Sequence, residues 1–201
     1  MTAEARKRQI AELTVDIVAE RGVQATTTSQ IAAAAGVTQS ALYRHFANRN
    51  AILLAALDVL YERIHAVIRW SQEGTVLERL QGIGRFHSDI VASERSTFVI
   101  PLFEFLAASP EAGLRESLRV HQMEVIRELA ELIEQGKADG SVRKDVDPEQ
   151  YSWELHGVYW AEDVTYLMGL RHFITSGRST TMLNHILDRM ATDPGVLASE
   201  Q

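Results

Sequence analysis

The chain has 201 residues, of which 46% are hydrophobic, so it is able to bury a core and overall disorder is not expected. It has no cysteine, which excludes disulfides, thiol nucleophiles and thiolate metal sites. The net charge of -7 is unevenly spread, since residues 1–50 sum to +2 and residues 51–201 to -9, so only the N-terminal segment suits a DNA partner.

Apolar residues recur at helical spacing almost throughout the chain, and strand alternation is almost absent, which predicts an all-α fold. The first predicted helix has its apolar stripe at Ile10, Leu13, Ile17 and Val18, and Gly22 ends it. Arg6, Lys7 and Arg8 at its start have two interpretations, an ordinary solvated helix start or an arm along DNA phosphates.

Two short helices follow the first one. Thr27 and Gln30 have capping-box spacing and open a helix that Gly36 ends. Thr38 is placed to cap a second short helix through His45. The sequence therefore predicts three helices that share one small core within the first 50 residues.

The rest of the chain predicts about six more helices. A long connecting helix runs from about Arg49 to Trp70, and a capping box at Thr75 opens the next one. The other start signals are Ser109-Pro110-Glu111, Asp147-Pro148-Glu149 and an apolar stretch over residues 98–108 with Pro101 near its start. These helices end near Asp139 and Phe173, and a last helix follows Ser179 and ends before Pro194. We expect about nine helices, divided into a helix-turn-helix DNA-binding domain (1–48) and a helical ligand-binding and dimerisation domain (49–201).

The second short helix exposes a polar surface without carboxylates, which suits DNA. Gln39 is able to contact an adenine edge, Arg44 a guanine edge or a phosphate, and Ala41 a thymine methyl group. An ordinary solvated arginine is the alternative for Arg44. Hydroxyl, imidazole and guanidinium donors to phosphate are expected at Thr28, Ser29, Tyr43, His45 and Arg49.

The residues on which a family resemblance rests are Gly22-x4-Thr27-x3-Ile31-Ala32-x2-Ala35-Gly36-Val37-Thr38-x3-Leu42-Tyr43-x-His45-Phe46-x2-Arg49. This pattern, over roughly residues 8 to 57, resembles the N-terminal signature of the TetR family of bacterial regulators. The resemblance implies DNA contacts at Thr28, Ser29, Gln39, Ser40, Ala41, Tyr43, His45 and Arg49. Many members of the family have glycine or proline at the position of Ser40, so the base preference is in question there, whereas the fold is not.

The last two predicted helices are unusually apolar on their surfaces. One face of the helix in residues 148–173 has Trp153, His156, Trp160, Val164 and Leu167. Together with the last helix it predicts a four-helix homodimer interface, as the resemblance also implies, although an ordinary core helix is the alternative. A two-fold dimer would place two recognition helices on a near-palindromic operator in double-stranded DNA.

Three histidines on or beside apolar faces indicate an effector pocket for a small, largely apolar molecule. The candidate lining residues are Phe86, His87, Phe98, Phe103, Phe105, His121, Met123, Trp153, His156 and Trp160. Core histidines bonded to backbone or carboxylate, and a metal site, are the alternatives, but no metal-ligand spacing supports a metal. No cofactor is expected, and the absence of nucleophile and phosphate-loop motifs predicts that the protein is not an enzyme.

These features favour a sequence-specific transcription regulator, a repressor that a small apolar ligand releases from its operator. The alternative is a helical small-molecule-binding or scaffolding protein whose N-terminal domain, called the head below, does not bind DNA. With no secretory signal and no apolar run long enough for a bilayer, a cytoplasmic protein without a membrane partner is expected.

Overall fold

The computed structural model describes residues 2–69, 73–93, 98–108 and 113–194. Within these ranges every regular element is an α-helix, ten in all, and an isolated antiparallel bridge joins Val142 and Ala191. The chain forms two compact units, Met1–Ile64 with Thr97–His121, and His65–Ser96 with Gln122–Gln201. The all-α prediction is confirmed, while the functional division after residue 48 stays a proposal. None of the helices described is long and apolar enough to cross a membrane.

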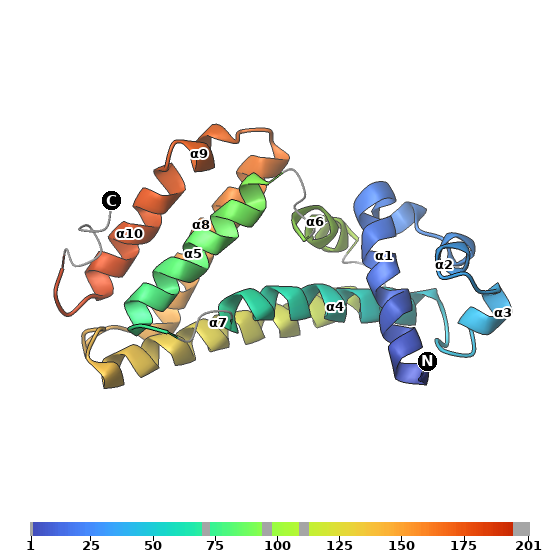
Figure 1. Ribbon diagram of the computed structural model, residues 1–201, viewed down its shortest axis with the longest axis horizontal. Helices are drawn as coiled ribbons and strands as arrows, with labels where there is room; N and C mark the ends of the chain where they lie inside the picture. The colour runs from blue at the N-terminus through green and yellow to red at the C-terminus, as the bar shows by residue number, and fades with distance from the viewer. Residues whose placement is uncertain (1, 70–72, 94–97, 109–112, 195–201) are drawn as a thin grey trace. The chain divides into compact units, whose positions relative to one another are not determined.

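The first unit holds the three N-terminal helices, the whole of α6 and parts of α4 and α7 (Figure 1). These are α1 (Ala3–Ala25), α2 (Thr28–Ala34), α3 (Gln39–Leu42), most of α4 (Arg49–Arg69), α6 (Val99–Ala107) and the start of α7 (Leu114–Asp139). Their shared core is formed by Ile10, Ile31, Leu42, Phe46 and Ile52, each at most 7% exposed. Apolar residues from four segments thus hold α1, α2, α3 and the start of α4 together.

The turn between α2 and α3 depends on Gly36, which has a φ of 64°. The backbone N–H of Val37 donates to the carbonyl oxygen of Ala32 at 2.9 Å, and the N–H of Gly36 donates to Ala33 at 3.1 Å. This pair of bonds is a Schellman motif, which ends a helix with one left-handed residue. The predicted capping box of Thr27 is confirmed as the start of the same helix.

Helix α3 is shorter than the sequence predicted. It ends at Leu42, and the residues up to His45 continue as a tight turn, in which the N–H of His45 donates to the carbonyl of Leu42 at 3.0 Å. The predicted cap at Thr38 is confirmed, because its hydroxyl accepts from the N–H of Ala41 at 3.1 Å. The tighter winding brings Phe46 into the core four residues after Leu42.

The end of α1 is held by side chains from two other helices of the first unit. Gly22 interrupts the helical geometry with a φ of 79°, as its predicted stop role requires. The guanidinium of Arg49 donates to the carbonyl oxygens of Thr26, at 2.8 Å, and Val23. The Glu104 carboxylate of α6 accepts from the N–H of Val23 at 3.3 Å. One peptide segment is therefore fixed by both α4 and α6.

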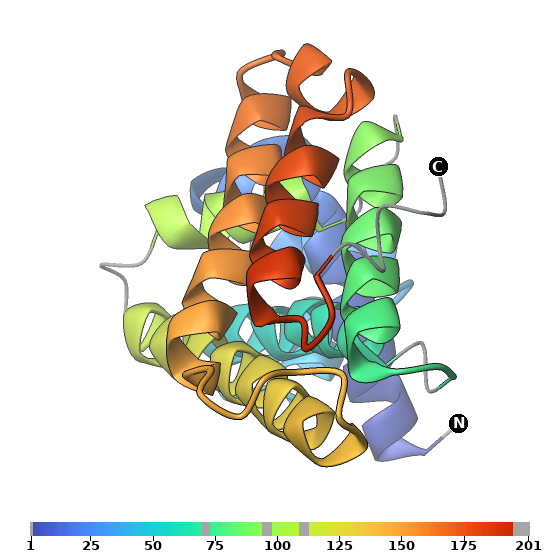
Figure 2. The same ribbon diagram turned by 90° about the vertical axis from the view of Figure 1, so that its left-hand side faces the viewer.

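The second unit contains the rest of α4 and α7, with α5 (Val76–Ala92), α8 (Pro148–Leu167), α9 (His172–Thr175) and α10 (Arg178–Met190). Helices α5, α8 and α10 lie side by side (Figure 2). At Gly84 of α5 a Cβ atom would lie 2.2 Å from the Leu183 side chain, so α10 packs directly on the α5 backbone there. The predicted starts at Thr75 and Asp147 are confirmed as side-chain caps.

Two expectations for the second unit are corrected. The helix predicted to reach Phe173 ends at Leu167. A short helix that was not predicted, α9, follows as a separate element. The last helix was expected to follow Ser179, but it begins at Arg178 and includes Ser179. The physical reason is glycine, because Gly169 (φ 73°) and Gly177 (φ 74°) both leave helical geometry. The start signal Ser109-Pro110-Glu111 and the end near Trp70 lie outside the described residues.

Alanine substitution at two uncrowded glycines isolates the cost of backbone strain at Gly36. A Cβ atom at Gly36 or Gly82 would meet nothing within 4 Å, but only Gly36 has a positive φ. We expect Gly36→Ala to lower the free energy of unfolding by about 1 to 2 kcal/mol. Gly82→Ala, inside α5, is the matched control and should raise it by up to about 1 kcal/mol. Urea denaturation measures both, and equal effects would contradict the role assigned to the Gly36 turn.

Candidate DNA-binding surface and effector site

The surface of α3 and the turn after it is polar and open to solvent. Gln39, Ser40 and Arg44 are exposed, and the Tyr43 side chain is 47% exposed, which is high for an aromatic residue. Ala41 and His45 are half-buried. An exposed aromatic ring among amide, hydroxyl and guanidinium groups is suited to a polar partner with a flat or grooved surface.

The start of α2 lies against this surface. Ser29 is exposed and Thr28 half-buried, and the Tyr43 hydroxyl lies 3.4 Å from the Thr28 hydroxyl. Residues 26–48 contain no aspartate or glutamate. The structure thus brings the predicted contact residues of α2 and α3 onto one region of the first unit that does not repel an anion.

The predicted basic contacts differ in how far they are engaged within the chain. Arg49 donates to two carbonyls of the α1 terminus, which gives it a structural role beside any phosphate contact. Arg6, Lys7 and Arg8 belong to α1 and each has a partner within the chain, for example Glu62 at 2.8 Å from Arg8. The structure therefore favours the ordinary helix start over a free arm for these three residues.

The residues predicted for the effector pocket are divided between the two units. Phe98, Phe103, Phe105 and His121 belong to the first unit. His121 stacks on Tyr61 with 4.6 Å between ring centroids, and its Nε2 atom lies 2.9 Å from the Asp58 carboxylate. Whether all the predicted residues line one cavity stays a prediction.

The remaining predicted residues belong to the second unit. Phe86 and Met123 are half-buried, and His87 and His156 are buried. Trp153 and Trp160 are more exposed than a pocket lining requires, at 44% and 39%. The rings of His156 and Trp160 lie 5.4 Å apart between centroids.

A buried polar cluster, which we define as His87, His156, Tyr159, Glu162 and Asp163, lies between α5 and α8 in the second unit. The His87 Nδ1 atom is 2.7 Å from the Glu162 carboxylate, and its Nε2 atom is 3.4 Å from Asp163. The second oxygen of Glu162 accepts from the Ser88 hydroxyl at 2.6 Å. The 2.7 Å contact is a charge-assisted hydrogen bond, whereas the 3.4 Å contact is only an ion pair.

The two histidines of the polar cluster differ in charge at neutral pH. Burial disfavours the charged form of His87, but contacts with Asp163 and Glu162 outweigh burial and raise its pKa to about 9. Burial, with the nearby charge of His87, lowers the pKa of His156 to about 4. Burial also raises the pKa of Tyr159 well above its usual value, so the phenol keeps its proton. Two carboxylates therefore face one imidazolium in a buried site.

Sequence reasoning found His87 and His156 but missed Glu162, which is 1% exposed. The signal was present, because Glu162 and Asp163 are adjacent acids in a helix with many apolar residues. Acids almost never become fully buried without a partner, so such a pair points to a histidine or arginine opposite.

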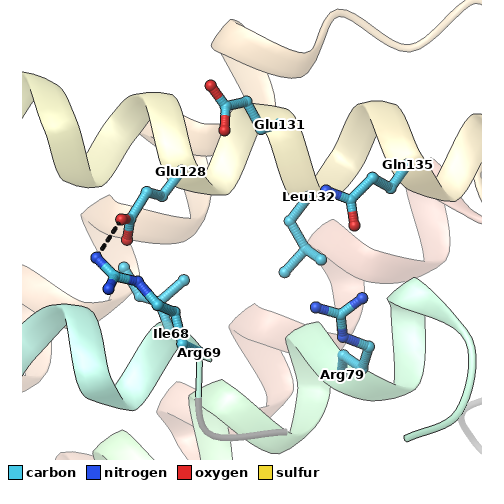
Figure 3. A pocket seen from close by; sticks show the side chains of 7 residues that line it. All are labelled: Ile68, Arg69, Arg79, Glu128, Glu131, Leu132 and Gln135. Carbon is cyan, nitrogen blue, oxygen red and sulfur yellow. Dashed lines mark hydrogen bonds and ion pairs between the residues drawn. The ribbon is translucent and has the colours of Figure 1, made fainter. Parts of the chain in front are cut away.

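A hollow of about 240 Å³ lies between the end of α4, the start of α5 and α7 (Figure 3). Its lining residues are Ile68, Arg69, Arg79, Glu128, Glu131, Leu132 and Gln135. Arg69 donates to Glu128 at 2.7 Å, and Glu128 also lies 2.9 Å from His65. Two arginines and two glutamates balance in charge, so the lining does not by itself call for a charged ligand.

Comparison with known proteins identifies the class of this protein. Residues 10–56 match the tetR family of bacterial regulatory proteins. The HTH-type transcriptional repressor KstR2 of Mycobacterium tuberculosis (strain ATCC 25618 / H37Rv) is 30% identical over 170 residues, which cover 82% of each chain. The chain belongs to the TetR family, and it is a helix-turn-helix regulator of transcription and not an enzyme, as the sequence predicted.

Solved structures share this fold. A TetR-family regulator from Cytophaga hutchinsonii has a TM-score of 0.80 at 18% identity, covering 96% of this chain and 98% of that one. FadR from Bacillus subtilis in complex with stearoyl-CoA has a TM-score of 0.70 at 20% identity, covering 89% and 96%. The predicted two-part architecture, a helix-turn-helix head and a helical body, is confirmed by these likenesses.

The pKa shifts of His87 and His156 together contribute most to stability near pH 6.5. The unfolded histidine pKa is about 6.5, so stability from the raised pKa of His87 is lost as the pH rises towards 9. Below pH 6.5 His156 is protonated in the unfolded chain, but in the folded chain it stays neutral down to about pH 4. Stability therefore falls as the pH decreases over this range.

Thermal unfolding followed by circular dichroism between pH 4 and 9 measures this profile. The His156→Gln variant should flatten the acid limb, while the same substitution at the exposed His185 should leave it unchanged. An acid limb that keeps its slope in His156→Gln would show that His156 is not buried in its neutral form.

Proposed function

We propose that this regulator is a homodimeric repressor that reads a near-palindromic operator with α3 and leaves it when an apolar effector binds. The exposed, carboxylate-free surface of α3, which the Gly36 turn positions, supports the proposal that the protein binds DNA. The relative KstR2 is named a transcriptional repressor, which supports the direction of regulation.

The proposed DNA contacts follow from chemistry and exposure. Gln39 reads an adenine edge in the major groove, and Ala41 contacts a thymine methyl group. Arg44 reads a guanine edge or binds a phosphate. The phosphate-binding set is Thr28, Ser29, Ser40, Tyr43, His45 and Arg49. Because a recognition helix this short reads few base pairs, two copies on a two-fold dimer are needed for specificity.

The dimer interface is proposed on α8 and α10. Trp153, Trp160, Val164 and Leu167 of α8 are each 39 to 44% exposed, and Met182 of α10 is 45% exposed. Large apolar side chains exposed in such number on two neighbouring helices mark a protein interaction surface. A second copy of the same chain covers this surface in a two-fold, isologous arrangement.

The effector is proposed to be small and largely apolar. FadR, which shares the fold, was solved with stearoyl-CoA, a molecule with a long apolar chain. The proposed lining in the second unit is Phe86, His87, Met123 and His156, while the more exposed Trp153 and Trp160 are assigned to the dimer surface. Phe98, Phe103 and His121 are a separate set of candidates within the first unit. The effector displaces DNA only as far as its affinity differs between the two dimer states.

A scaffolding or ligand-binding protein with an inactive head is the competing proposal. Salt dependence separates the two, because phosphate contacts make log affinity for DNA fall linearly with log salt concentration. A head that no longer binds DNA would show neither this slope nor a preference for the DNA beside its own gene.

Operator binding tests the assignment of α3. Gln39→Ala should cost about 1 to 3 kcal/mol at one base position, because the alanine cannot bond the base edge. Tyr43→Phe should weaken binding to all sequences, since the lost hydroxyl serves the phosphates. Fluorescence anisotropy with operator and base-substituted duplexes measures both, and Gln150→Ala at the start of α8 is the control. Unchanged affinities in both variants would remove α3 as the reading helix.

The dimer surface is tested with one substitution at two valines of equal exposure. Val164 of α8 and Val120 of α7 are each 40% exposed. Val164→Glu should yield monomers in sedimentation velocity and reduce operator affinity, because a charge would be buried in the interface beside its two-fold copy. Val120→Glu should remain a dimer. Two variants with the same oligomeric state would exclude this interface.

A further inference from the structure

The polar cluster contains three buried atoms whose hydrogen bonding is incomplete. The Nδ1 atom of His156, the hydroxyl of Tyr159 and the Oδ1 atom of Asp163 have no hydrogen-bond partner among the described residues. Their residues are at least nine-tenths buried, at 9%, 7% and 3% exposure. A buried polar group without a partner is costly, so such a concentration indicates a site that another molecule completes.

The contacts of His156 fix which of these atoms donates. The Gln122 amide nitrogen lies 2.7 Å from the His156 Nε2 atom, so Nε2 accepts and the proton is on Nδ1. His156 is therefore a donor without an acceptor, and Asp163 Oδ1 has the ion pair with His87 at 3.4 Å but no hydrogen-bond donor. The Tyr159 hydroxyl is able to do either.

A ligand hydroxyl fits this combination. It is able to donate a hydrogen bond to the Asp163 carboxylate and to accept one from the His156 N–H or the Tyr159 hydroxyl. A carboxylate would accept from the same donors but would place a third negative charge beside Glu162 and Asp163. One imidazolium, His87, already serves both of these acids, so like-charge repulsion would dominate.

We propose that the polar cluster binds a hydroxyl group of the effector, so that the effector is an apolar alcohol and not a free carboxylic acid. The inference rests on the proposed function, since it specifies the chemistry of the effector in that account. Two aromatic rings lie beside the cluster, since the Tyr159 ring is 4.9 Å from that of His87 and the Trp160 ring 5.4 Å from that of His156 between centroids.

Three probes of similar size test this chemistry on the full-length chain. They are 1-decanol, its isomer methyl nonyl ether, which accepts but cannot donate, and decanoate. Isothermal titration is carried out below the solubility limits of the alcohol and the ether and below the micelle concentration of decanoate. It should show 1-decanol binding at least about tenfold more tightly than the ether, because the ether cannot form the hydrogen bond to a charged acceptor. Decanoate should also bind more weakly than 1-decanol.

An Asp163→Asn variant identifies the acceptor. Its amide oxygen still accepts from a hydroxyl but has no charge, so the disadvantage of decanoate should shrink several-fold. The advantage of 1-decanol over the ether should also become smaller without disappearing, because a neutral acceptor forms a weaker hydrogen bond. Glu131→Gln, at an exposed position of α7, removes the same charge and should leave all three affinities unchanged. If Asp163→Asn does not fold, the comparison of probes on the unaltered chain decides.

Equal binding of the alcohol and the ether, tighter binding of decanoate, or no binding of 1-decanol would each overturn the proposal. None of these measurements involves DNA. Failure of operator binding with alcohol selectivity intact would overturn only the proposed function, and operator binding without alcohol selectivity would overturn only the effector chemistry.

Discussion

The left-handed backbone at Gly36 determines where α3 lies. Two backbone hydrogen bonds, from Val37 to Ala32 and from Gly36 to Ala33, end α2 and turn the chain by the angle that puts Leu42 and Phe46 into the core. Once those two side chains are buried, the opposite side of the same short segment has to face solvent. The exposed recognition surface is thus a consequence of one glycine conformation and two buried anchors.

In the second unit, charged side chains are buried between packed helices. Gly84 lets α10 approach the α5 backbone, while α5 and α8 enclose His87 with Glu162 and Asp163. Well-packed leucines would stabilise this layer at lower cost, because buried charges lose their hydration. A buried charged group with incomplete hydrogen bonding is therefore more readily explained by binding than by folding. In the first unit, the Glu104 carboxylate of α6 accepts a hydrogen bond from the end of α1, so α6 is linked directly to the DNA-binding head.

Local signals in the sequence predicted the fold well. Caps at Thr27, Thr38, Thr75 and Asp147 act within three residues, so they are readable without tertiary structure. The helix ends after Leu42 and Leu167 were less predictable, because tertiary packing and glycine turns decide them. The partners of the histidines could not be predicted from the sequence. Glu162 lies 75 positions from His87, and only the packing of α5 on α8 brings them together. The double engagement of Arg49 with the end of α1 was missed for the same reason.

Methylation interference shows whether α3 enters the major groove of operator DNA. Methylation at guanine N7 modifies only the major groove. If α3 reads that groove, modified guanines abolish binding at two symmetric half-sites centred about 34 Å apart, or a multiple of that distance. Binding that tolerates methylation at every guanine N7 of the protected site, while adenine N3 methylation in the minor groove blocks it, would exclude α3 from the major groove.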